Sequence, residues 1–325
     1  MNYLKDKARI PAGGQALIEG VMMKCGSSKA IAVRKSDGTI EVKREKLSVP
    51  KDGSIKKLPF VRGMFMLVES MVEGGKDLTY SANLYAEGFD EEEESKFDRW
   101  LKKVFGDRLD DVINMVSIVL SVIIAVGLFI VLPTVIGKGV ATDRTFTVAL
   151  REGALKLSIF VGYLLLMSQM KDIKRVFQYH GAEHKSIFAY EQGIELNVEN
   201  VKKMGRLHPR CGTNFMFVVI AISIAIFSFV GIRNVWLRSL VKIAVFPLMA
   251  GISYEIIRFA GKHQNRFTRA MVWPGLMMQK ITTKEPDDSQ IEVAIASLKA
   301  VLEDEGIIKR EFATTAEVVD PEALI

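Results

Sequence analysis

Residues 112–136 read VINMVSIVLSVIIAVGLFIVLPTVI, and this stretch contains no charged residue. A helix needs about 20 mostly apolar residues to cross the ~30 Å hydrocarbon core of a bilayer. The stretch meets that requirement, and Pro133 stands near its end, where a proline can kink or terminate a helix. It predicts a transmembrane helix and places the chain among membrane proteins.

Three further stretches are apolar enough to cross a bilayer, and they lie at about 153–170, 215–232 and 236–259. The second span carries Lys156 near one end, where the lysine stem can snorkel to the interface. The fourth is less clean, because charged residues flank its apolar centre, 243–254. We therefore expect a mostly α, polytopic helical bundle of about four transmembrane helices.

The composition agrees with a membrane protein. The 325 residues are 49% hydrophobic with a mean hydropathy of +0.19, although 25% are charged, so the apolar residues must be concentrated in blocks. The net charge of +6 is typical of positively charged loops beside a membrane. No basic stripe is interleaved with aromatic residues, so nucleic acid is not an expected partner. The expected partners are the lipid bilayer and a membrane protein bound to it.

The charge of the loops predicts the orientation. Basic side chains accumulate in the loop 171–211, at Lys171, Lys174, Arg175, Lys185, Lys202, Lys203, Arg206 and Arg210. Because positively charged loops stay on the inner side, this loop is expected in the cytoplasm. With four spans, both termini follow it there. The predicted location is the cytoplasmic membrane, with a multi-pass topology.

The chain is expected to divide into a cytoplasmic region at 1–110, a transmembrane bundle at 111–260 and a cytoplasmic tail at 261–325. Apolar residues alternate on both sides of Asp37-Gly38, which predicts a β-hairpin over residues 30–47.

Two amphipathic helices are predicted outside the spans. Residues 60–87 read as a helix with acidic residues at helical spacing and an apolar face opposite them, which lies on the bilayer, packs on the bundle or fills a domain core. A second amphipathic helix is expected after the N-cap cluster Asp287-Asp288-Ser289, with Gly306 near its end.

Four histidines occur, and two of them form the pattern His180-Gly181-Ala182-Glu183-His184. Spacing i, i+4 puts both imidazoles on one face of a helix, close enough to share a metal ion. Glu183 lies beside them, where it can take a proton from an activated water as the catalytic base. H-x-x-E-H is also the inverted zincin signature, but this chain lacks the size and membrane-free character of those proteases. The alternative is a pair of ordinary histidines at the membrane interface.

Further donors are available in His208-Pro209-Arg210-Cys211, directly before the third span. A helix N-terminus at that position favours a thiolate as ligand or nucleophile. The alternatives are a loop histidine next to a proline and a small buried cysteine. Elsewhere, Glu255 reads as a ligand or as the ion-pair partner of Arg258, and His263 as a residue at the level of the lipid headgroups.

The glycine-rich segment 13–24 reads GGQALIEGVMMK. It is not a Walker A loop, because no Gly-Lys-Ser/Thr follows the glycines. It is not a dinucleotide fingerprint, because no predicted strand precedes it. We expect the glycines to allow a close backbone approach to the bundle. Glu19 is an alternative outer ligand.

Three of these segments together, GGQALIEGVMMK, YHGAEHKSIFAYE and HPRCGTNF, resemble the YqhQ-like family of bacterial integral membrane proteins. The resemblance covers the chain from about Gly13 to Leu298 and includes the tail segment TTKEPDDSQIEVAIASLK. That family is of unknown function and is often labelled as predicted metal-dependent enzymes. The resemblance implies a membrane architecture and a metal, with the same site residues, His180, Glu183, His184, His208 and Cys211.

Two functions remain open at this point. In the first, zinc is held by His180, His184 and one of His208 or Cys211, and the protein is a metal-dependent hydrolase of a membrane-associated substrate. In the second, the same donors form a closed structural site, or bind no metal, in a non-catalytic scaffold or assembly factor. Three protein ligands with an open position favour catalysis, and four favour structure. Transport is less favoured, because the first and third spans contain no ionisable side chain.

Overall fold

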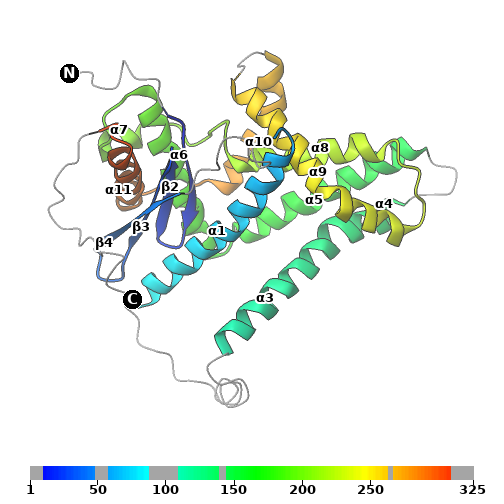
Figure 1. Ribbon diagram of the computed structural model, residues 1–325, viewed down its shortest axis with the longest axis horizontal. Helices are drawn as coiled ribbons and strands as arrows, with labels where there is room; N and C mark the ends of the chain where they lie inside the picture. The colour runs from blue at the N-terminus through cyan, green and yellow to red at the C-terminus, as the bar shows by residue number, and fades with distance from the viewer. Residues whose placement is uncertain (1–9, 48–57, 88–108, 139–143, 263–265, 309–325) are drawn as a thin grey trace. The chain divides into compact units, whose positions relative to one another are not determined.

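The computed structural model describes residues 10–47, 58–87, 109–138, 144–262 and 266–308. The chain forms two compact units. The first, here the sheet unit, comprises residues 1–88, 164–218 and 250–325. The second, the helical unit, comprises residues 89–163 and 219–249. The described residues are mostly helical, as predicted, with one small antiparallel sheet (Figure 1).

The sheet has four strands that pair in sequence order, β1 (Ala12–Leu17), β2 (Gly20–Cys25), β3 (Ser28–Arg34) and β4 (Ile40–Lys46). The predicted hairpin is confirmed as β3–β4, which pair antiparallel up to Arg34 and Ile40. Gly38 lies in the turn with φ 86°, a left-handed conformation that glycine adopts without steric cost.

The first hairpin, β1–β2, was not predicted. Its register closes on Leu17 and Gly20, with Ile18 and Glu19 in the turn. Strands are usually identified by β-branched and aromatic residues, and AGGQAL has neither. Glu19 adopts φ 49° in the turn, and its buried carboxylate is held there by the Arg175 guanidinium and the Tyr179 hydroxyl.

Helices cover both faces of the sheet. On one face, α6 (Lys171–Gln192) and α11 (Asp288–Asp304) share a core with β1–β3, into which the strands direct Ala12, Val21, Met23, Ala30 and Ala32. On the other face, Leu17, Met22, Ile31 and Val33 pack against Leu84 of α1 (Val61–Ala86). This alternation follows the two-residue period of a strand, and it fixes α6 over the sheet.

The predicted C-terminal helix is confirmed as α11. Asp287 caps it in a capping box with Gln290, and Gly306 follows its end with φ 65°. Two further helices of the sheet unit, α7 (Val198–Lys202) and α10 (Arg266–Thr282), were not predicted.

The predicted helix 60–87 is α1, and it buries part of its polar side. Asp77 lies 2.6 Å from the amino group of Lys29, and both side chains are buried. The apolar residues on its other side are exposed, among them Phe65, Val68, Met71 and Val72.

Two helices are long and apolar enough to cross a membrane, at Met115–Gly137 and Val235–Ala260. The first runs through α3 (Leu109–Val126), a π-helical turn η3 (Gly127–Val131) and α4 (Leu132–Gly137), and the second lies in α9 (Val235–Lys262). The pair α5 (Thr145–Met167) and α6 counts as a third only if their break is ignored. The third predicted span corresponds to α8 (Gly212–Phe227), a shorter apolar helix. The described residues thus contain two to three candidate spans, where about four were predicted.

Candidate metal centre

The predicted helix carrying the paired histidines is α6. It begins after Met170, whose extended backbone separates it from α5, and it ends at Gly193, which has φ 70°. His180 and His184 are one turn apart on the same face, and their ring centroids are 4.4 Å apart. The shared face of a helix therefore brings two imidazoles together, as their spacing predicted.

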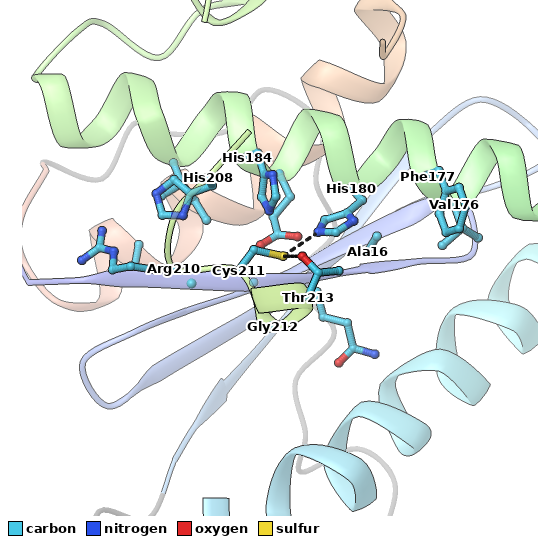
Figure 2. A pocket seen from close by; sticks show the side chains of 16 residues that line it. Ala16, Val176, Phe177, His180, His184, His208, Arg210, Cys211, Gly212 and Thr213 are labelled. Carbon is cyan, nitrogen blue, oxygen red and sulfur yellow. Dashed lines mark hydrogen bonds between the residues drawn. The ribbon is translucent and has the colours of Figure 1, made fainter. Parts of the chain in front are cut away.

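Cys211 supplies a third donor from the segment before α8. Its Sγ lies 3.3 Å from Nε2 of His180, and the Thr213 hydroxyl donates to the sulfur at 3.4 Å. Figure 2 shows both imidazoles directed from α6 toward this cysteine. The donor atoms of His180, His184 and Cys211 all lie within 4.8 Å of one another. Ligands on tetrahedral zinc are roughly 3.3–3.6 Å apart by the usual Zn–N and Zn–S lengths, so small movements would complete the geometry.

Backbone carbonyls orient both rings. Nδ1 of His180 lies 2.9 Å from the Thr282 carbonyl oxygen, and Nδ1 of His184 lies 2.5 Å from the Arg206 carbonyl oxygen. A carbonyl only accepts, so each Nδ1 carries the proton and donates it. In the neutral tautomer, each Nε2 keeps a free lone pair. Metal-binding histidines are usually oriented by such a bond from their other nitrogen.

Burial favours the neutral form of His184 and His208. It lowers the pKa of His184, with a smaller opposing effect from the neighbouring cysteine. Burial also lowers the pKa of His208, and the nearby Glu183 partly offsets this. Neutral imidazole is the form that binds a metal ion, so the site is ready for one near neutral pH.

Glu183 is buried beside the donors but does not belong to the three-donor group. Burial raises its pKa, opposed in part by His180 and His208 and by a hydrogen bond from the backbone N–H of Gly14. The carboxylate does not pair with Lys185, whose amino group binds the Glu285 carboxylate and the Lys202 carbonyl. A carboxylate with a raised pKa is a stronger proton acceptor than an ordinary one, which suits a general base.

His208 lines the same cavity but is turned differently. Its Nε2 lies 3.4 Å from the Glu191 carboxylate, and its ring centroid is 5.6 Å from that of His184. Its backbone is fixed by Gln279 of α10, which accepts from the His208 N–H at 2.7 Å and donates to its carbonyl at 2.8 Å. The structure therefore groups Cys211, and not His208, with the paired histidines.

Other residues considered from the sequence lie elsewhere. Glu255 accepts hydrogen bonds from the Arg62 guanidinium and from the Phe60 N–H, and Arg258 adds a weaker charge interaction. Glu19 is held by Arg175 in the β1–β2 turn. His263 lies outside the residues that the structure describes.

The donors line a cavity of about 390 Å³. Its walls are β1, the donor face of α6 and the segment 208–213, where Thr213 is an addition that sequence reasoning missed. Gly14 in β1 is essential to this packing, because an added Cβ would lie 3.0 Å from Cγ of Glu183 and 2.6 Å from the Met22 carbonyl oxygen. The glycines do allow a close approach, but its partner is a side chain of the site.

Comparisons with known proteins identify the family. The model of the family described as "Protein of unknown function (DUF1385)" matches residues 58–304, which include all the donors. The "Uncharacterized protein YqhQ" of Bacillus subtilis (strain 168) is 34% identical over 322 residues, which cover 97% of this chain and 100% of that protein. No solved structure matches the chain. The expected resemblance is confirmed, and this chain belongs to the YqhQ-like DUF1385 family, whose function is unknown.

Proposed function

We propose that this protein is a membrane-embedded, metal-dependent hydrolase with zinc held by His180, His184 and Cys211. The observation that carries the proposal is the convergence of the donor atoms of His180, His184 and Cys211. It is supported by the Nδ1–H groups of both histidines, which donate to backbone carbonyls and leave each Nε2 available to a metal. Among the described residues, this is the one group of three His, Cys, Asp or Glu side chains whose donor atoms all lie within 4.8 Å of one another.

Three ligands leave one tetrahedral position open, which is typical of catalytic zinc. His208 lies outside the group of converging donor atoms, and this favours the open form over a closed structural site. Bound zinc would supply a Lewis acid that acidifies water and polarises a carbonyl group. Glu183 would accept the water's proton and deliver it to the leaving group, while Gly14 orients its carboxylate.

The proposal includes a multi-pass topology in the cytoplasmic membrane, with the site and both termini on the cytoplasmic side. The helix Met115–Gly137 supports membrane insertion, since none of its most apolar window is buried within the protein. The basic residues of 171–211 support the inner location, because this segment contains both site motifs.

Metal analysis tests the proposal. Purified protein is stripped of metal, reloaded with zinc and compared with His184→Ala and Cys211→Ser at equal concentration. We expect one zinc per chain in the wild type and at least a tenfold weaker affinity in both variants, with His208→Gln close to wild type. A wild type that binds no stoichiometric zinc would leave the non-catalytic scaffold as the better account. Tight binding lost in His208→Gln would instead indicate a closed site.

A further inference from the structure

The wall of the cavity opposite the histidines is a sheet edge. β1 is the first strand in the order β1-β2-β3-β4, so among the described residues only one of its sides pairs with another strand. Five consecutive residues of β1, 12–16, line the same cavity as the metal donors. Whatever enters the cavity therefore meets a strand edge and the proposed zinc site together.

The register shows which backbone groups of β1 face outward. In a hairpin with a two-residue turn, the pair flanking the turn, here Leu17 and Gly20, exchanges both hydrogen bonds. Bonded pairs then recur every second residue, which assigns the amides of Gln15 and Gly13 to β2. The N–H and C=O groups of Ala12, Gly14 and Ala16 are left for the free edge. Of these groups, the Gly14 N–H already donates to the carboxylate of Glu183, so the groups open to another chain are the Gly14 C=O and the N–H and C=O groups of Ala12 and Ala16.

Nothing in the side chains of β1 blocks this edge. Residues 12–17 read AGGQAL and include no charge and no proline, the two usual means of protecting an edge strand. Gly13 and Gly14 are exposed, and a Cβ added to Gly13 would meet no atom within 4 Å. An unprotected edge of this kind is a template for pairing with another extended chain.

We infer that the substrate is an extended peptide segment that adds to the free edge of β1 and places its scissile carbonyl beside Glu183 and the His180, His184, Cys211 donors. This inference rests on the proposed hydrolase function. A peptide backbone offers N–H and C=O groups that can pair with Ala12 and Ala16 on either side of Gly14, whereas a sugar or an acyl chain does not.

The reaction is hydrolysis of a peptide bond. The hydroxyl of water bonds to the carbonyl carbon, the C–N bond breaks, and the proton accepted by Glu183 goes to the departing amine. No oxidant or reductant is required. Because Gly14 holds Glu183, the peptide bond facing Gly14 would be the one cleaved, and the segments on either side would pair with Ala12 and Ala16.

The test compares two metal chelators on the zinc-loaded, full-length protein. Acetohydroxamate binds zinc without a peptide, and the hydroxamate of acetyl-Leu-Ala-Gly adds an extended backbone. We expect the peptide hydroxamate to bind at least about tenfold more tightly. N-methylation of the peptide nitrogen that faces β1 should remove most of this gain, and methylation of the adjacent nitrogen should not. Equal affinities of the two chelators would overturn the inference, as would indifference to methylation at both nitrogens.

Protein variants test the same edge from the other side. Ala12→Pro and Ala16→Pro each remove an outward N–H without breaking a bond to β2, and Ala16→Val keeps the N–H. One of the two proline variants should lower peptide hydroxamate affinity about tenfold and leave acetohydroxamate affinity unchanged. Which of the two variants does so shows in which direction the peptide runs along β1. If neither does so while acetohydroxamate still binds, the inference fails and the proposed function stands. If zinc-loaded wild type binds neither chelator, the proposed function itself fails.

Discussion

Two polar clusters in the described part of the chain differ in how their groups are satisfied. In the helical unit, the ion-pair cluster joins Glu152 to Arg238 at 2.9 and 3.0 Å and to Lys242 at 2.9 Å. Thr134 accepts a further bond from Lys242. In the sheet unit, the donor cluster of His180, His184 and Cys211 instead holds nitrogen and sulfur atoms that converge on a cavity.

The two clusters therefore differ in role: the ion-pair cluster stabilises the fold, and the donor cluster is arranged to bind a ligand. Charges that are buried with opposite charges at hydrogen-bonding distance stabilise the fold when both partners are present and are costly when one is lost. Imidazoles that direct their protons to carbonyls, and their lone pairs to a shared point, contribute little to folding in this way. Their arrangement is explained by a ligand.

The largest expected effect is in the ion-pair cluster. Glu152→Gln removes the carboxylate that compensates two buried cations, Arg238 and Lys242. Breaking a buried pair typically costs about 3–5 kcal/mol. Thermal unfolding in detergent should show this loss, while any folded fraction keeps its zinc affinity. An unfolding temperature equal to that of the wild type would show that the ion-pair cluster does not stabilise the fold.

Glu183→Gln is the matched change in the sheet unit. The amide can still accept from Gly14, and it removes the charge that burial disfavours at Glu183. We expect stability within about 1 kcal/mol of the wild type and zinc affinity within a few-fold. Cleavage of a peptide substrate should fall by roughly 10²–10⁴, the usual contribution of a general base. Unchanged cleavage would remove Glu183 from the mechanism.

Gly14→Ala sharpens the account of how the cavity wall is built. The new methyl group would lie 2.6 Å from the Met22 carbonyl oxygen, a backbone atom that has little freedom to move. Such overpacking costs about 1–3 kcal/mol. Gly13→Ala is the control, because its Cβ meets nothing within 4 Å. Equal unfolding temperatures of the two variants would show that the close approach at Gly14 is not required.

The smallest expected effect is a dependence on pH. Burial holds the folded-state pKa of His184 and His208 below the ordinary value of 6.5. Between that value and the lower folded pKa, the unfolded chain binds more protons, so metal-free protein should lose stability as pH falls below about 6.5. The raised pKa of Glu183 acts in the opposite direction, because the folded state then binds the extra proton.

His208→Gln isolates one of these contributions. It should flatten the acid loss of stability by at most about 1.4 kcal/mol per pH unit. Unfolding temperatures between pH 7.5 and 5.5 measure the slope. A slope identical to that of the wild type would show that His208 is not held neutral by the fold.

Much of the site could be predicted from local sequence. The i, i+4 spacing on α6 fixed the relation of His180 to His184, and the N-cap cluster Asp287-Asp288-Ser289 predicted the start of α11. The choice between His208 and Cys211 could not be made, because it depends on contacts from Glu191 and Gln279 that are distant in sequence. The Arg206 and Thr282 carbonyls that orient the two rings are backbone groups, so no residue type in the sequence could predict them.

Strand β1 and the number of spans were harder to predict from the sequence. β1 consists mostly of glycine and alanine, so its strand character comes from pairing with β2 and packing under α6 rather than from propensity. Hydropathy identified the apolar run at 215–232, but the helix there ends at Phe227 and is too short to pass as a span. A break at residues 168–170 likewise separates α5 from α6.

Zinc-edge X-ray absorption on the reloaded wild type tests the central claim most directly, because it reports ligand type and distance. The account predicts two nitrogen ligands at ~2.0–2.1 Å, one sulfur at ~2.3 Å and one further light atom from solvent. The sulfur contribution should vanish in Cys211→Ser. A spectrum of the wild type with no sulfur ligand, or with three or more nitrogen ligands from histidine, would contradict the site assigned to His180, His184 and Cys211.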